Sequence, residues 1–424
     1  MQPAPNAVPS QRPRPRPSAR ADGVSLPWLL RWMHLHSCEL IIWAFFVSAA
    51  VYKRWYIATA VALLITMVAG AVGVVRLRRF LPAIFPFLLY HAYQCLGVLW
   101  TQYREGVAFT AVIAIIGSVV AFLFWSLVRN HSLDAISDIF VRLPYPALLL
   151  TAYELISKSG SERSGGYSLT FMAMSVPFCY EQLMRKRRPW RAGIALLIAF
   201  LVLVVSRSRA PLSAALLSGV LAFLFIGRGF AARFRIVAIA AVAVPVLLAA
   251  LLAVETTRTV VLMTWVRFSK QEVVEEGLYI PAERQDVVRA DLAENIPRLL
   301  LAAQPLGIGL GAYPFYHERV YGYRNSIHNI IALWAIEGGV VLLLIVFWML
   351  WRHVRALFRA MKTPARAFAI CVLINTFAAL AIGVYHRIDA TFWVALGLGI
   401  GVRDQYVRRR VRRALVRPAA RLSA

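Results

Sequence analysis

Long apolar runs separated by short polar stretches follow one another along almost the whole chain. The apolar runs are residues 34–52, 55–75, 80–100, 106–128, 140–157, 167–184, 191–206, 209–226, 235–254, 327–351, 365–384 and 390–403. Runs of this kind cross the hydrocarbon core of a bilayer, which is about 30 Å thick, as helices. The pattern therefore predicts an all-α polytopic membrane protein with about 12 transmembrane helices.

The composition agrees with this class, because 60% of the residues are hydrophobic and 16% are charged, whereas about 25% of a soluble domain is charged. The net charge of +27 comes largely from basic clusters at every second junction, such as RKRRPWR at 185–191 and RRRVRR at 408–413. Such clusters face the cytoplasm in polytopic proteins, so we expect both chain ends there. Their placement indicates membrane lipids rather than nucleic acid as the partner of the positive charge.

The spacing of the apolar runs divides the chain into five parts. They are a disordered basic cytoplasmic tail (1–33), transmembrane helices 1–9 (34–254), a large periplasmic loop (255–326), transmembrane helices 10–12 (327–403) and a second basic cytoplasmic tail (404–424). The loop is too rich in apolar and aromatic residues for disorder, so we expect it to be partly helical and to fold onto the outer face of the bundle. We expect no cleavable signal peptide, because the first apolar run is already a full span.

The cysteines all lie inside apolar runs and form no CxxC pair. Because isolated cysteines in such runs usually behave as small apolar side chains, we expect free thiols in the helix interfaces. The prediction applies to Cys38, Cys95, Cys179 and Cys371.

A short basic segment, SRSRAP at 206–211, joins two very apolar runs in a tight helical hairpin. Arg207 and Arg209 lie at its outer mouth, where each either extends to the lipid headgroups or binds a phosphate. A guanidinium presents a planar fork of donors that matches two phosphate oxygens. Pro211 can start the next helix, whose amino end adds partial positive charge at the same place. The segment therefore predicts diphosphate binding by Arg209 and Arg207.

The apolar run after the long loop opens with IHNIIALWAIEGG at 327–339. His328 begins this helix at the membrane surface, with Asn329 beside it, and its imidazole is either a structural residue or a general base. Nearby arginines would favour the neutral ring that accepts a proton. Glu337 lies deeper and is expected to be structural, paired within the bundle. The helical spacing predicts an apolar face made by Leu333, Ile336 and Val340.

A third segment, residues 284–311, holds the candidate anion ligands Arg284, Arg289 and Arg298, each of which is otherwise a solvated loop arginine. It ends in PLGIGLG, residues 305–311, a weak GxGxG match with no strand before it and no clear helix after it. These glycines therefore indicate a tight loop close to the helix bundle rather than a dinucleotide site.

The three segments occur in order around the long loop, as SR, then an arginine followed by PLGIGLG, then HN–x7–E–x–G. Together they resemble the bacterial O-antigen ligase and O-antigen polymerase superfamily over roughly residues 200–345. The resemblance makes Arg209 the arginine at the outer end of the hairpin and His328 the essential histidine. Arg289 best matches the loop arginine. Arg284 remains a rival, because family members often have an aromatic residue where Ala293 stands.

The resemblance implies a type C glycosyltransferase-like bundle in the Gram-negative inner membrane, with its active site on the periplasmic side. It implies a donor glycan on undecaprenyl diphosphate and a sugar hydroxyl of lipid A-core as acceptor. His328 would take the acceptor proton, and Arg209, Arg207 and Arg289 would stabilise the diphosphate leaving group. Asn329 and Arg298 are secondary candidates. The implied reaction inverts the anomeric centre without a metal or cofactor.

Three other functions remain open. An O-antigen polymerase would share most of these residues, and Arg298–x10–Gly309 resembles an arginine–glycine spacing in some polymerases. A protein O-oligosaccharyltransferase of the same superfamily usually has a longer carboxyl region. A flippase or transporter of lipid-linked glycans would place charges at mid-membrane in broken helices, and few lie there in this sequence.

Overall fold

The computed structural model describes residues 81–149, 166–185, 188–205, 209–226, 273–275, 278–280, 296–301, 305–322, 330–382 and 390–421, with a few isolated positions besides. Its helices are α3 (Leu81–Leu96), η2 (Gly97–Leu99), α4 (Arg104–Asn130), α5 (Leu133–Arg142), α7 (Gly166–Met184), α8 (Pro189–Val205), α9 (Arg209–Ile226), α13 (Tyr313–Tyr321), α14 (Ile330–Ala360), α15 (Arg366–Ile382) and α16 (Ala390–Arg421). One antiparallel hairpin joins β1 (Val273–Glu275) to β2 (Leu278–Ile280). Apart from this hairpin, the all-α prediction is confirmed for the described residues.

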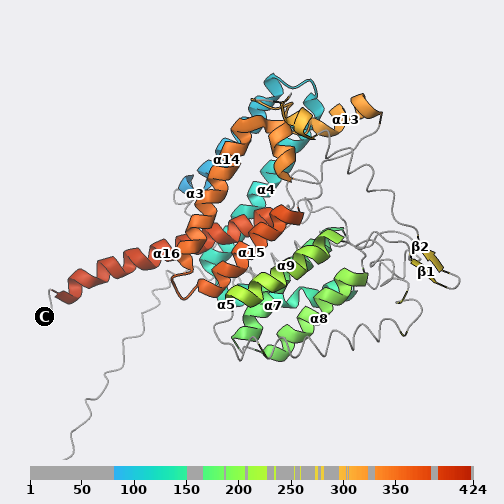
Figure 1. Cartoon of the computed structure of the whole chain (residues 1–424). Helices are drawn as coiled ribbons and strands as arrows, with labels where there is room; N and C mark the ends of the chain where they lie inside the picture. The colour runs from blue at the N-terminus through green and yellow to red at the C-terminus, as the bar shows by residue number, and fades with distance from the viewer. Residues whose placement is uncertain are drawn as a thin grey trace, which may run out of the picture.

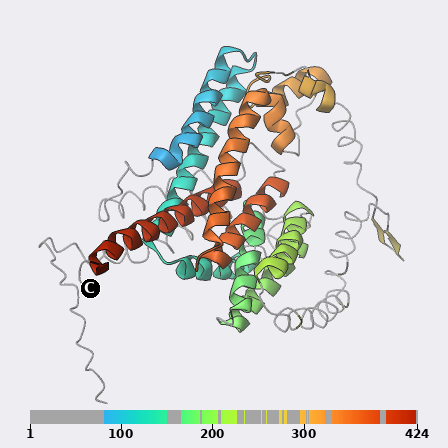
Figure 2. The same ribbon diagram turned by 60° about the vertical axis from the view of Figure 1, so that its left-hand side comes forward.

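Figure 1 shows α3, α4 and α14 running together towards α13, while α7, α8 and α9 form a second group beside α15. The view in Figure 2 gives the same arrangement, and in both views the carboxyl half of α16 extends away from the other helices. The predicted basic tail, residues 404–424, continues α16 as helix up to Arg421.

Several helix boundaries agree with the hydropathy pattern. α7, α8 and α9 begin and end close to the predicted runs 167–184, 191–206 and 209–226. The predicted run 140–157 is not one helix: α5 ends at Arg142, and a further helical stretch covers residues 144–149. Ser132 caps α5 by accepting a hydrogen bond from the Ala135 amide at 3.2 Å. The predicted spans 34–52, 55–75 and 235–254 lie outside the described residues.

One helix of the described part, α14, is both long and apolar enough to cross a membrane. Shorter apolar helical stretches are Phe85–Leu99, Val120–Arg129, Pro189–Val204, Pro211–Ile226 and Arg366–Leu380. Each falls within or overlaps a predicted apolar run, and the total of about 12 spans remains a prediction.

The helix contacts define how neighbouring helices run. α4 and α16 are parallel, since contacts advance along both together: Gly117 with Trp393, Ala121 with Gly397, Val128 with Gly401. α7 and α15 are antiparallel. Met174 O accepts from Asn375 Nδ2 at 3.1 Å, and Pro177 O accepts from Cys371 Sγ at 3.3 Å.

α3 and α14 are likewise antiparallel, because Tyr93 contacts Gly338 and Phe85 contacts Trp348. α3 also runs against α4, where His91 and Ser118 are hydrogen-bonded. These directions are the ones that alternating membrane crossings require. α4, α14 and α16 run one way, and α3 and α15 run the other.

The core between α5, α7 and α15 is built from stacked aromatic rings. Phe178 lies 4.7 Å from Phe140 and 5.4 Å from Phe368, measured between ring centroids. Cys179 and Cys371 are buried free thiols, as predicted, whereas the prediction for Cys95 is wrong because its α3 position is exposed. Cys38 lies outside the described residues.

Candidate functional site

A kink in α14 is the main irregularity near the predicted site. Gly339 has φ 64° and ψ −167°, far from helical values, although the helix continues on both sides of it. A kink of this kind separates carbonyl groups from the amides that would normally bond to them. The freed acceptors need other donors, because Glu337, Gly338 and Gly339 are all buried.

The PLGIGLG loop supplies two of these donors. The Ile308 amide donates to Ile336 O at 3.0 Å, and the Gly309 amide donates to Glu337 O at 2.9 Å. The loop therefore adds to α14 through its backbone. The prediction of a tight loop close to the bundle is correct. The expectation that no helix follows was wrong, since α13 starts at Tyr313.

Glycine is required where this loop meets the kink. Gly307 has φ +78°, and a Cβ there would lie 2.3 Å from Glu337 O. A Cβ on Gly339 would lie 2.0 Å from Pro305 O. Real Cβ atoms do not approach backbone oxygens this closely, so both positions need glycine for space as well as for a positive φ.

The third donor comes from α3. The Tyr93 hydroxyl lies 2.7 Å from Gly338 O and 3.0 Å from Leu306 O, and its single proton can be donated to either. Just after η2, the Thr101 hydroxyl donates to Ile308 O at 2.9 Å. The α3–α4 connection thus holds both the kink and the loop. We call this set the kink junction: Tyr93, Thr101, residues 305–313 and residues 336–339.

Glu337 connects the kink junction to α13. Its buried carboxylate accepts a hydrogen bond from the Tyr313 amide at 3.1 Å, at the amino end of α13. A carboxylate at this end of a helix satisfies a free amide and interacts favourably with the helix dipole. Glu337 is buried and holds a structural contact within the bundle, as its depth in the helix suggested.

A small apolar cluster places the helical turn 296–301 against α14. Ala303, Tyr313, Leu333 and Ile336 form its buried part, and Ile296, Leu299 and Leu300 pack against it. Arg298 lies on the same turn but is exposed. Of the predicted apolar face, Leu333 and Ile336 are buried, whereas Val340, which follows the kink at Gly339, is 45% exposed. Arg298 is thus held beside the start of α14 without being buried.

The remaining predicted site residues are described only in part. Arg209 is the first residue of α9. Pro211 is buried in the first turn of the same helix. Arg207, Arg284, Arg289, His328 and Asn329 lie outside the described residues. α14 is described from Ile330, which immediately follows the last two of them in sequence.

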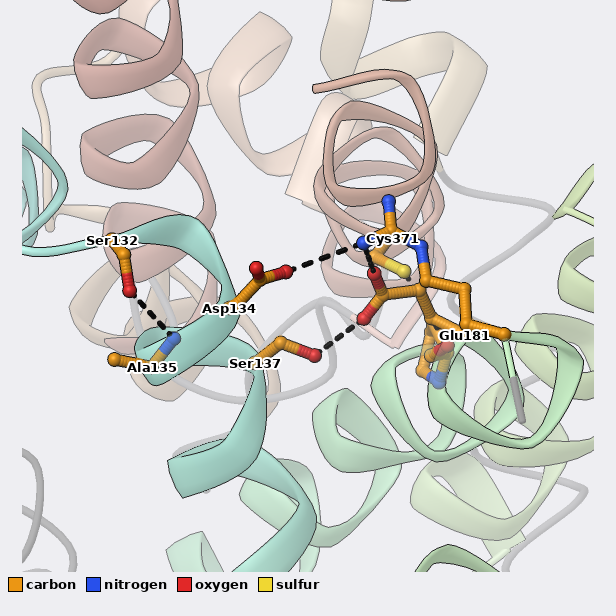
Figure 3. Close-up of polar contacts among 8 residues, drawn as sticks. Ser132, Asp134, Ala135, Ser137, Glu181 and Cys371 are labelled. Atoms are coloured by element: carbon orange, nitrogen blue, oxygen red, sulfur yellow. Dashed lines mark hydrogen bonds and ion pairs between the residues drawn. The ribbon is translucent and has the colours of Figure 1, made fainter. Parts of the chain in front are cut away.

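A second polar cluster lies at the other end of the bundle. Glu181, buried on α7, accepts a hydrogen bond from the Ser137 hydroxyl at 2.5 Å and pairs with Arg185 Nη1 at 3.1 Å. Arg185 also pairs with Asp134 at 3.3 Å, and Figure 3 shows these contacts between α5 and α7. These contacts form a structural ion network that joins α5 to the end of α7.

A cavity of about 600 Å³ opens beside this network. Its lining residues come from the α4–α5 connection, the end of α7, the α14–α15 connection and α16: Arg129, His131, Ser132, Leu133, Asp134, Glu181, Arg185, Pro364, Ala365, Phe368 and Gln405. In the predicted topology all these connections are cytoplasmic, so the cavity lies at the end of the bundle opposite the kink junction. Within the described residues, no group of three His, Cys, Asp or Glu side chains is arranged to hold a metal ion.

Sequence reasoning missed Tyr93 and Thr101, which complete the kink junction. Both stand in or next to an apolar run, and neither forms a motif with the residues they contact. Their contacts on the loop and on α14 lie more than two hundred residues away in the chain. The sequence offered one indication, the Gly338–Gly339 pair. It suggests a break in the helix but does not show which residues bind the backbone there.

The sequence around the kinked α14 matches a family model. Residues 194–347, from α8 to beyond the kink, match the family model described as O-antigen ligase. This is a family of bacterial integral membrane proteins with glycosyltransferase-like activity, comprising ligases and polymerases. The match supports a member of the O-antigen ligase superfamily over these residues and agrees with the resemblance noted from the motifs. A comparison with curated proteins gave no match.

Proposed function

We propose that this protein is an O-antigen ligase of the Gram-negative inner membrane. It would transfer a glycan from undecaprenyl diphosphate to a sugar hydroxyl of lipid A-core at the periplasmic face. Family membership supports a lipid-linked glycan donor and a lipid acceptor in general. The particular donor, acceptor and location are our inference from the motif residues.

The reaction we propose is a direct displacement at the anomeric carbon. The acceptor oxygen attacks this carbon, the bond to the diphosphate oxygen breaks, and undecaprenyl diphosphate leaves with its electron pair. His328 takes the acceptor proton as the new bond forms, which contributes about 10²–10⁴-fold to the rate. The anomeric configuration inverts, and Asn329 is positioned by sequence to assist His328.

Stabilisation of the leaving group falls to arginines. Arg209 is the first residue of α9, whose amino end adds partial positive charge, and Arg207 stands two residues before it in the sequence. Arg289, or its rival Arg284, would approach from the long loop. Charge that develops on the diphosphate is thus met by fixed guanidinium groups, without a metal ion in the proposed mechanism.

One observation carries the proposal: the match to the O-antigen ligase family covers the whole arginine–loop–histidine region, residues 194–347. The kink junction supports it further. The turn that holds the exposed Arg298 packs on Leu333 and Ile336 of α14, the helix that directly follows His328. A guanidinium beside the start of this helix is what an anionic donor next to a general base requires.

The test uses a strain that lacks this protein, complemented with the wild type or with His328→Ala. Lipopolysaccharide and the lipid carrier fraction are then separated on gels. We expect His328→Ala to lose polymer on lipid A-core while polymer accumulates on the carrier. His131→Ala, at the opposite end of the bundle, is the matched control and should keep the full ladder. A full ladder with His328→Ala would disprove its role.

A polymerase is the second candidate, and one observation favours it. Arg298 and Gly309 have the spacing noted above, and the short connection between them joins the exposed turn to the kink junction. The same experiment separates the two functions. Loss of a polymerase leaves lipid A-core carrying a single repeat unit, whereas loss of a ligase leaves lipid A-core without any.

A further inference from the structure

We propose that Tyr93 is a positioning residue for the reaction: by holding the carbonyl of Gly338 at the kink, it fixes the direction of the first turns of α14, which follow His328 and Asn329 in the sequence. The inference rests on the proposed function for what His328 does. It extends the site to α3, outside residues 194–347 that match the family.

The contacts of Tyr93 place it at the point where α14 bends. Three successive carbonyls of α14 accept hydrogen bonds from outside the helix: Ile336 O, Glu337 O and Gly338 O. The first two bonds come from amides of the long loop. The third, 2.7 Å long, is to the Tyr93 hydroxyl and is buried.

Tyr93 differs from the loop amides because it belongs to a firmly packed helix. Its own side chain is buried, and one turn earlier on α3 Tyr90 packs against Trp393 of α16. Phe87, also on α3, lies 5.3 Å from the Trp393 ring between centroids. Tyr93 therefore ties the kink directly to the bundle, whereas the loop amides tie it to a loop that is itself held by Thr101.

A rotation at the kink is amplified at the start of α14, which follows His328 and Asn329 in the sequence. The segment from Ile330 to Gly339 extends about 14 Å at about 1.5 Å per residue, so a rotation of about 4° at the kink moves its start by about 1 Å. A misplacement of this size in a reacting group can cost about 100-fold in rate. A single buried hydrogen bond at the bend is thus well placed to control the position of the helix start, and with it a base that precedes the helix in the sequence.

Tyr93→Phe tests this directly, because it removes only the hydroxyl. Tyr145→Phe is the matched control: its hydroxyl also donates to a backbone carbonyl, Arg191 O at 3.0 Å, at the opposite end of the bundle. Both variants are purified as full chains in lipid nanodiscs. Transfer from an undecaprenyl-diphosphate-linked glycan to lipid A-core is then measured at varied donor concentration.

We expect Tyr93→Phe to lower kcat by about 10- to 100-fold, with the donor KM changed less than about threefold. Tyr145→Phe should leave kcat and KM within about twofold of wild type. An unchanged kcat in Tyr93→Phe, or an equal loss in both variants, would overturn the positioning role.

Hydrogen exchange gives a readout that does not depend on activity. Peptides that cover residues 303–311 report the Ile308 and Gly309 amides bound to the kink. These amides should exchange at least about tenfold faster in Tyr93→Phe than in the wild type. In Tyr145→Phe they should exchange at the wild-type rate. Equal protection in the wild type and both variants would overturn the inference. His328→Ala should keep wild-type exchange. If it also keeps activity, the proposed catalytic role fails while the exchange result still decides whether Tyr93 holds the kink.

Discussion

Gly307 and Gly322 have the same backbone φ of +78°, but only Gly307 lies against another element. A Cβ on Gly307 would lie 2.3 Å from Glu337 O, whereas a Cβ on Gly322 would meet nothing within 4 Å. Gly322 ends α13 with a residue in the left-handed region, a common way to end a helix. Substitutions at these two glycines therefore distinguish the energetic cost of a positive φ from the cost of a steric clash with a neighbouring element.

Alanine at these two positions should give clearly different results. Gly322→Ala should lower the free energy of unfolding by about 1 kcal/mol through backbone strain alone. Gly307→Ala should cost about 1–3 kcal/mol more, because the loop must move off the kink of α14. Thermal unfolding in detergent measures both. Equal losses in the two variants would show that the loop does not pack on α14 as described.

Replacement of Glu337 should loosen α13. In Glu337→Ala the buried Tyr313 amide loses its carboxylate acceptor, which costs about 1–3 kcal/mol. Glu337→Gln keeps an oxygen at the same place and should cost less. Hydrogen exchange of peptides from residues 312–322 measures the effect locally. The prediction is contradicted if the glutamine and alanine variants exchange at the same rate.

The sequence defines the helices of this fold better than their distortions. α9 spans 209–226, as the apolar run predicts, because charged residues and a turn bound it on one side and glycine on the other. The α14 kink could not be derived in the same way. Its geometry depends on Ile308, Gly309 and Tyr93, which stand in other segments and show no periodic relation to Gly339.

In the candidate site, too, local features were predictable from the sequence and contacts between distant segments were not. Local chemistry identified Glu337 as structural and the PLGIGLG glycines as a close loop, since both follow from short segments. The exposure of Val340 was not predicted, because helical spacing assumes an unbroken helix and the kink changes the phase. Thr101 was missed because a single hydroxyl at the end of an apolar run carries no signal of its distant partner, Ile308.

Arg298 should contribute to donor binding more than a neighbouring surface arginine. In Arg298→Ala we expect the donor KM to rise by about tenfold, because one charge-assisted contact to phosphate contributes roughly 1.5 kcal/mol. Arg298→Lys should recover part of this, since lysine keeps the charge without the planar fork. Arg319→Ala is the control: this arginine is exposed on α13 and contacts Gln102 at 3.4 Å. Equal KM values for Arg298→Ala and Arg319→Ala would exclude Arg298 from the donor site.

The ion network at the opposite end should stabilise the bundle through Glu181. Loss of one partner of a buried ion pair costs about 3–5 kcal/mol. Because the Arg185 side chain is 34% exposed, solvent screens part of this interaction. We therefore expect Arg185→Ala to lower the free energy of unfolding by only about 1–3 kcal/mol.

A double variant tests whether the buried charge is the cause. Arg185→Ala combined with Glu181→Gln should be more stable than Arg185→Ala alone, because the carboxylate that lost its partner is then neutral. Arg188→Ala is the surface control. Arg188, whose side chain is exposed, contacts Asp138 at 3.7 Å, and a surface pair of this kind contributes about 0–1 kcal/mol. Unfolding midpoints in detergent at one pH compare the wild type, Arg185→Ala, the double variant and Arg188→Ala. If the double variant is less stable than Arg185→Ala, the network acts through packing and not through the charge of Glu181.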